Sequence, residues 1–129
     1  MNPITLKQVN PHNYKTDPII DFNLNQLIDA INIIQESYGK QLTITSGLRS
    51  DAQQKLLIAA GKSKATKSLH LSGEAIDVSD ADSLFWAFLM KNIDLLEKLG
   101  IYLEDKNSTP TWTHLQLRPP KSGKRIFIP

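Results

Sequence analysis

The sequence contains no cysteine among its 129 residues. This absence excludes a disulfide framework, a zinc ribbon and a thiol nucleophile. Any metal ion would therefore have to be held by histidine and carboxylate side chains, and the chain has only three histidines. The sequence also lacks a run of about 18 apolar residues of the kind that crosses a lipid bilayer. We therefore expect no insertion into a membrane.

The first residues, MNPITLKQVNPHNYK, lack the basic segment and apolar core that mark a secretory signal peptide. We therefore expect the protein to be cytoplasmic as synthesised. The formal net charge is only +2, with a pI near 8.9, which argues weakly for an anionic polymer as partner. We expect a monomer that does not bind nucleic acid.

The length of 129 residues is typical of one domain. Residues 1–20 are rich in Pro, Asn and Thr, and this composition predicts an irregular N-terminal arm ahead of a single domain at residues 21–129. Residues 118–129, with three prolines, predict an irregular strap at the other end. Between these ends, sequence patterns predict both helices and strands.

Apolar residues at helical spacing predict three helices, over residues 21–40, 49–62 and 82–100. Asp21 or Asn23 is the expected N-cap of the first helix, and Ser50 that of the second. Alternating apolar and polar residues predict strands at 41–47, 74–80, 101–105 and 111–117, the last two joined as a hairpin. The expected fold is α+β, with a small antiparallel sheet flanked by about three helices.

Two histidines and one aspartate are candidate metal ligands. Asp77 lies between Ile76 and Val78 in a strand that is predicted to be buried, and a buried carboxylate needs a partner. Gly73 allows the chain to turn so that His70 can fold back over this strand, and His114 lies in another predicted strand. Two His and one Asp would leave the fourth tetrahedral position open, as in catalytic zinc sites. The simpler alternative is a loop histidine and an ordinary strand aspartate.

Arg49 follows a predicted strand and directly precedes a helix N-cap. From there it can turn into a cleft above the sheet and pair with a substrate carboxylate or an oxyanion. The alternative is a surface salt bridge to Asp51. Three lysines shortly before His70 are either solvated surface or part of a basic rim that attracts acidic peptides; they are Lys62, Lys64 and Lys67.

Three blocks of the sequence together resemble the zinc peptidases of the M15 type. The blocks are SGLRS at 46–50, SLHLSGEAID at 68–77 and WTHLQ at 112–116, and the resemblance covers residues 41–117. This family includes D-alanyl-D-alanine carboxypeptidases and L-alanyl-D-glutamate endopeptidases and is related to the hedgehog signalling domain. The resemblance implies the fold that the D-Ala-D-Ala peptidases share with the hedgehog domain. It also implies that His70, Asp77 and His114 bind Zn²⁺, and that Arg49 contacts the substrate or the developing oxyanion.

The sequence departs from the family pattern at the general base. Many members place a Glu or Asp three residues before the last His ligand, where this sequence has Thr111. Glu104 and Asp105, at the end of the preceding strand, are the alternatives. The parity of Glu104 with Tyr102 along the strand favours Glu104 as the inward residue. Glu74 is near the ligands in sequence, but strand alternation places it on the opposite face.

These observations predict a zinc metallopeptidase that hydrolyses an amide bond in peptidoglycan stem peptides, either D-Ala-D-Ala or L-Ala-D-Glu. Ser68 and Trp112, beside the ligands, are expected to contact the substrate together with Arg49. We expect a phage or prophage enzyme that acts on the cell wall after release or as part of a virion. Two alternatives stay open: a zinc-binding pseudoenzyme in which the metal only holds the fold, and a virion structural component with vestigial site residues.

Overall fold

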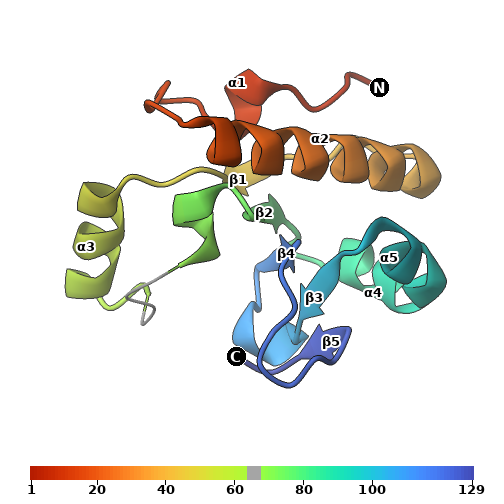
Figure 1. The fold of residues 1–129 in the computed structure, drawn as a ribbon. Helices are drawn as coiled ribbons and strands as arrows, with labels where there is room; N and C mark the ends of the chain where they lie inside the picture. Colours follow the sequence, from red (N-terminus) through yellow and green to blue (C-terminus); the bar gives the residue numbers. More distant parts are fainter. Residues whose placement is uncertain (64–67) are drawn as a thin grey trace.

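A computed structural model describes residues 1–63 and 68–129 and confirms the expected α+β fold (Figure 1). Lys64 and Lys67 therefore lie outside the described residues. None of the helices in these two ranges is long and apolar enough to cross a lipid bilayer. The elements, with η for short 3₁₀ turns, are α1 (Leu6–Val9), α2 (Pro18–Tyr38), β1 (Ile44–Ser46), α3 (Asp51–Ala59), η1 (Leu69–Ser72), β2 (Ala75–Ser79), α4 (Leu84–Met90), α5 (Ile93–Leu99), β3 (Tyr102–Glu104), η2 (Lys106–Ser108), β4 (Trp112–Gln116) and β5 (Ile126–Phe127).

The five strands form one sheet in the order β1-β2-β4-β3-β5. The pairs β1–β2, β2–β4 and β3–β4 are antiparallel, as expected, whereas β5 pairs with β3 in parallel. The C-terminal strap, residues 118–129, thus contributes a short edge strand. Leu103 N donates to Arg125 O at 2.8 Å and Asp105 N donates to Phe127 O at 2.7 Å. The sheet is therefore mixed and not purely antiparallel. The sequence did not predict β5 because a strand of two residues is too short to show an alternating pattern.

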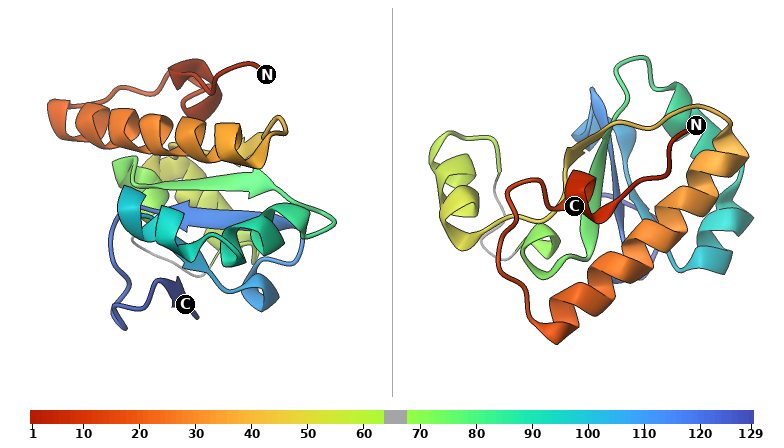
Figure 2. Two further views of the ribbon diagram at one scale, coloured as in Figure 1. Left: turned by 90° about the vertical axis from the view of Figure 1, so that its right-hand side faces the viewer. Right: turned by 90° about the horizontal axis from the view of Figure 1, so that it is seen from above.

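Helix α2 covers one face of the sheet, while α3 lies at one side of the molecule and α4 and α5 at the other (Figures 1 and 2). The core lies between α2 and the sheet, where the apolar stripe of the helix meets the inward residues of β2, β3 and β4. It includes Leu24, Leu27, Ile31, Ile34, Ile76, Val78, Leu103 and Leu115. Residues that alternate with these on the strands face the other way, toward the candidate site.

The N-terminal segment is packed into the fold more closely than its composition predicts. Ile4 and Val9 are buried in the core, and Leu48 N donates to Val9 O at 2.7 Å. Helix α2 begins at Pro18, earlier than expected, because the Asp17 side chain accepts from Ile20 N at 2.8 Å and proline suits the first helical position. The four-residue helix α1 is too short to produce a helical period that sequence reasoning can detect.

The predicted helix at 82–100 is divided into α4 and α5. The backbone of Asn92 leaves helical geometry, with φ −130° and ψ 44°, and its Nδ2 donates to Phe88 O at 2.8 Å. An asparagine side chain that competes for backbone groups in this way favours a helix end. The two short helices pack beside the sheet instead of forming one long rod.

The buried carboxylate of Asp80 joins α4 to the sheet. It accepts from Phe85 N at 3.0 Å, Trp86 N at 2.9 Å and Thr113 Oγ1 at 2.8 Å, and it pairs with Lys106 Nζ at 3.3 Å. We expect Asp80→Ala to lower the free energy of unfolding by about 3 kcal/mol, since it leaves several buried donors without an acceptor. Urea titration followed by circular dichroism measures this difference.

The matched control for this prediction is Asp82→Ala. Asp82 is exposed and accepts one hydrogen bond, from Leu84 N at 3.1 Å. Its removal should cost less than about 1 kcal/mol. Equal losses in the two variants would contradict the role assigned to Asp80.

Candidate metal centre

Strand register brings two of the three candidate ligands together. In the β2–β4 ladder, Asp77 lies opposite His114 and Ala75 lies opposite Gln116. Because directly opposed residues point to the same face of a sheet, Asp77 and His114 project together. Their neighbours Ile76 and Leu115, which are also paired, point into the core under α2. Alternation along each strand thus separates the site from the core, as the sequence predicted.

The third candidate ligand, His70, is carried by the turn η1. Ser68 Oγ accepts from His70 N at 3.2 Å at the start of this turn, and Gly73 ends it with a positive φ of 74°. A Cβ at Gly73 would lie 2.9 Å from Leu24 Cγ, so the turn also needs glycine in order to approach α2. Asn23 Nδ2 donates to Ser72 O at 3.0 Å and ties the turn to the helix. His70 is thereby folded back over β2.

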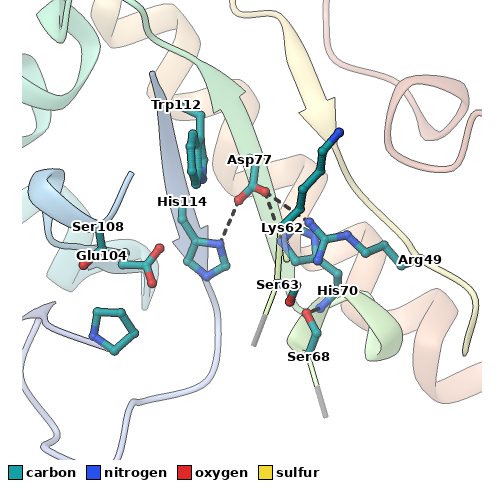
Figure 3. Close-up of a pocket in the computed structure, with 11 residues that line it drawn as sticks. Arg49, Lys62, Ser63, Ser68, His70, Asp77, Glu104, Ser108, Trp112 and His114 are labelled. Carbon is teal, nitrogen blue, oxygen red and sulfur yellow. Dashed lines mark hydrogen bonds and ion pairs between the residues drawn. The ribbon is translucent and has the colours of Figure 1, made fainter. Parts of the chain in front are cut away.

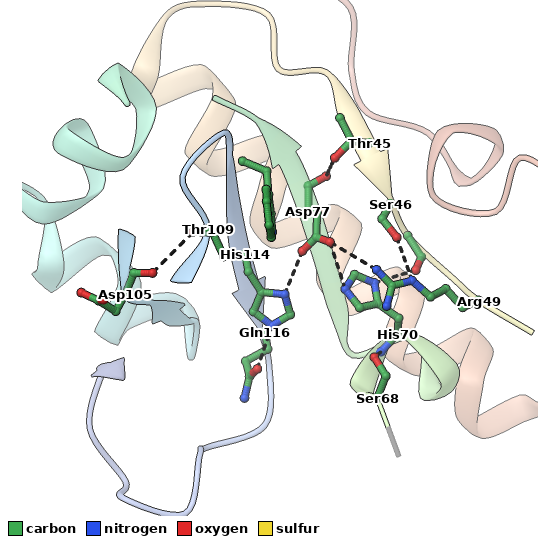
Figure 4. Close-up of polar contacts among 12 residues, drawn as sticks. Thr45, Ser46, Arg49, Ser68, His70, Asp77, Asp105, Thr109, His114 and Gln116 are labelled. Carbon is green, nitrogen blue, oxygen red and sulfur yellow. Dashed lines mark hydrogen bonds and ion pairs between the residues drawn. The ribbon is translucent and has the colours of Figure 1, made fainter. Parts of the chain in front are cut away.

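The ligand atoms of His70, Asp77 and His114 converge on one point (Figure 4). Asp77 Oδ1 lies 2.8 Å from His114 Nδ1, Asp77 Oδ2 lies 3.3 Å from His70 Nε2, and all three groups have ligand atoms within 4.8 Å of one another. Tetrahedral zinc with bonds of about 2.0–2.1 Å keeps its ligands about 3.3 Å apart. The spacing therefore fits a small divalent ion.

The outward nitrogens of both imidazoles lie within hydrogen-bond distance of carbonyl oxygens, which can accept a hydrogen bond but cannot donate one. His70 Nδ1 lies 2.8 Å from Gly47 O, and His114 Nε2 lies 2.9 Å from Gln116 Oε1. These nitrogens therefore carry the protons, and in the neutral rings the inward nitrogens present lone pairs to the Asp77 carboxylate. Three electron-pair donors that face one another need a cation between them, so the donor set fits a metal ion.

The electrostatics of the site favour an anionic Asp77. Burial alone would raise the pKa of this carboxyl, but its contacts with the imidazoles of His114 and His70 outweigh burial and hold the pKa far below its usual range. For His114, burial would lower the pKa, but the adjacent Asp77 raises it overall. The carboxylate thus keeps its charge and attracts a cation to the centre of the group.

Arg49 lies on the other side of Asp77, with its guanidinium held by three groups. Its Nη2 lies 3.5 Å from Asp77 Oδ2, Nε donates to Ser46 Oγ at 3.1 Å, and Nη1 donates to Gln54 Oε1 at 3.1 Å. Burial lowers its pKa, although Asp77 opposes the change. The guanidinium therefore points into the site instead of forming the surface pair with Asp51 that the sequence left as an alternative.

Gln54 and Gln116 contribute to the site although the sequence pattern did not mark them. Gln54 is buried on α3 and also donates from Nε2 to Ser63 Oγ at 2.9 Å, so it connects Arg49 to the segment after α3. A lone glutamine in an amphipathic helix carries little signal. Gln116 shares a strand face with His114, and this parity was the available clue.

The three candidate ligands border one cavity of about 570 Å³ (Figure 3). It contains the candidate ligands, Arg49 and both residues expected to contact substrate, and Lys62 of the possible basic rim also reaches it. The lining residues are Arg49, Lys62, Ser63, Ser68, His70, Asp77, Glu104, Ser108, Trp112, His114 and Pro129. A cavity with a cationic side and a carboxyl side suits a polar peptide substrate.

The two candidate bases are placed differently. Glu104 lines the cavity, and Figure 3 shows its carboxyl on the His114 side, away from Arg49. Asp105 does not line it; its carboxylate accepts from Asn107 N at 3.2 Å at the start of η2. Burial, together with the charges of Asp77 and Asp105, raises the pKa of Glu104 against the opposing effect of His114. A carboxyl with a raised pKa beside the ligands suits proton transfer.

The backbone around Glu104 is firmly held. Trp86 Nε1 donates to Glu104 O at 3.1 Å, and β3 pairs with β4 through Leu103 and Leu115. Extended by one residue, this register places Glu104 beside His114 and on the same face of the sheet.

Thr111, at the position where many relatives carry the base, is exposed, and its carbonyl oxygen accepts from Asp80 N at 3.0 Å.

Comparisons with known proteins show the family of this chain and a similar fold. A model of the Peptidase M15 family matches residues 5–115. The crystal structure of the Serratia marcescens L-Ala D-Glu endopeptidase ChiX is similar, with a TM-score of 0.59 at 21% sequence identity. The match covers 89% of this chain and 98% of that chain. No curated protein sequence matches the chain significantly.

Proposed function

The chain belongs to the M15 peptidase family, and from this premise we propose that it is a zinc-dependent peptidase that cleaves an amide bond in peptidoglycan stem peptides. The observation that carries the proposal is the convergence of His70, Asp77 and His114 beside the cavity-lining carboxyl of Glu104. Since the similar structure is that of an L-Ala D-Glu endopeptidase, the L-Ala–D-Glu bond is the first candidate. Origin from a phage or prophage stays a prediction.

His70 Nε2, His114 Nδ1 and a carboxylate oxygen of Asp77 would hold the zinc ion. Among the described residues, no fourth His, Asp or Glu joins this group, which leaves room for substrate and water. When bound, zinc would act as a Lewis acid that polarises the peptide carbonyl and makes a water molecule more acidic. The tautomers of the two imidazoles, set by Gly47 O and Gln116 Oε1, already present the nitrogens that this requires.

The other residues of the cavity would move protons and position the peptide. Glu104 would accept a proton from the attacking water and deliver it to the leaving amine. Arg49 would pair with a carboxylate of the stem peptide or stabilise the negative charge that develops on the carbonyl oxygen. Trp112 and Ser68, which line the same cavity, would contact the peptide next to the scissile bond.

Digestion of purified sacculi tests this function and identifies the bond. We expect zinc-loaded protein to release soluble products, with new amino termini on D-Glu if the L-Ala–D-Glu bond is cut, or free D-Ala if the terminal bond is cut. Mass spectrometry after amine labelling separates the two results. Chelator-treated protein is the control. Absence of both products from the zinc-loaded sample would contradict the peptidase function and favour the pseudoenzyme.

A further inference from the structure

The side-chain amide of Gln116 bridges His114 and the segment that follows β4. Its Oε1 lies 2.9 Å from His114 Nε2, and its Nε2 donates to Arg118 O at 2.8 Å. Gln116 is 7% exposed, so water has little access to replace either partner. Because the Arg118 carbonyl only accepts, the NH₂ end of the amide must face it. The oxygen end is therefore turned toward His114.

The segment that carries this carbonyl is tied to Glu74, whose buried carboxylate pairs with the exposed side chain of Arg118. Arg118 Nε and Nη2 donate to the Glu74 carboxylate at 3.1 and 2.7 Å, and Ser72 Oγ donates to Glu74 at 2.6 Å. Leu117 N also donates to Glu74 O at 2.9 Å. Glu74, which the sequence placed away from the ligands, thus anchors the start of the strap to the turn that carries His70. The amide of Gln116 is therefore oriented by the Arg118 carbonyl, a group that does not belong to the metal site.

The two imidazoles differ in how they are held. His70 is oriented by a backbone carbonyl, that of Gly47, which a side-chain substitution does not remove. His114 depends on the side chain of Gln116. Outer partners of this kind fix the tautomer and ring orientation of a metal-binding histidine, and their loss typically weakens metal binding about 10- to 100-fold.

We propose that Gln116 is a positioning residue, which keeps the proton of His114 on Nε2 and so directs Nδ1 toward the metal ion. The inference rests on the proposed function only in requiring that the site binds zinc. It assigns no direct contact of Gln116 with substrate or metal. Its effect passes entirely through His114.

The test compares Gln116→Leu, which removes the acceptor, with Gln116→Glu, which restores one. Competition with a chromophoric chelator measures the affinity for Zn²⁺ alone, and ¹⁵N NMR of the zinc-loaded proteins locates the proton on His114. We expect Gln116→Leu to bind zinc about 10- to 100-fold more weakly than the wild type. Gln116→Glu should stay within about tenfold, because a carboxylate also accepts from Nε2.

Gln35→Leu is the matched control, since Gln35 is a buried glutamine that accepts from Leu42 N at 2.8 Å far from the ligands. It should lose thermal stability and keep its zinc affinity. Unchanged affinity in Gln116→Leu, or a proton on Nδ1 of His114 in the zinc-loaded wild type, would overturn the inference alone. If Gln116→Leu does not fold, the inference is still tested by the position of the His114 proton in the wild-type spectrum and by the zinc affinity of Gln116→Glu. Failure of the wild type to bind zinc would overturn the proposed function as well.

Discussion

Replacing Glu104 by glutamine should lower the rate of stem-peptide hydrolysis by about 10²- to 10⁴-fold, the usual cost of losing a positioned general base. Glutamine keeps the size and the hydrogen-bonding shape of the side chain but cannot take up a proton. The change should therefore appear in kcat and leave zinc binding intact. Release of soluble peptide from sacculi gives the rate, and the zinc-induced rise in melting temperature reports the metal site.

Asp105→Asn is the matched control for Glu104→Gln. The two carboxyls are adjacent in the chain, but only Glu104 lines the cavity, whereas Asp105 holds the start of η2. Asn can replace Asp at a cap, so Asp105→Asn should keep activity within a few-fold. A large loss in Asp105→Asn with little loss in Glu104→Gln would reverse the assignment of the base.

The strand pattern of the sequence was sufficient to predict which strand faces carry Asp77 and His114. Asp77 and His114 each lie between residues that point into the core, so alternation alone placed them on the free faces of two strands. Their position directly opposite each other depends on the strand register, which alternation alone does not give and which the structure shows. Alternation likewise favoured Glu104 over Asp105, and the structure places Glu104 in the cavity.

Contacts that depend on tertiary packing could not be predicted in this way. Gly47 is an example: a Cβ there would lie 2.2 Å from Val9 O, because the N-terminal segment passes directly over it. Nothing in the composition of residues 1–20 indicates that approach. The direction of the Gln116 amide similarly depends on the Arg118 carbonyl, whose position is set by an ion pair with the distant Glu74. Such arrangements combine residues whose individual patterns are ordinary.

Replacing Asp77 by asparagine should abolish both zinc binding and peptidase activity. Asp77 supplies the only carboxylate of the His70–Asp77–His114 group. Without its charge, the site loses an anionic ligand and the group that faces both inward nitrogens. Because removal of an outer partner already weakens binding about 10- to 100-fold, loss of a direct ligand should exceed about 100-fold.

Melting temperatures with and without zinc measure this effect directly. Zinc at about 100 times its Kd should stabilise the wild type by about 2.7 kcal/mol, which is on the order of 10 °C for a domain of this size. Asp77→Asn should show no shift relative to its own chelator-treated sample, whereas Asp51→Asn, in the exposed first turn of α3, should behave like the wild type. An equal shift in Asp77→Asn would place the metal elsewhere. A wild-type shift without cleavage of sacculi would identify a pseudoenzyme, since in that case the ion stabilises the fold without supporting hydrolysis.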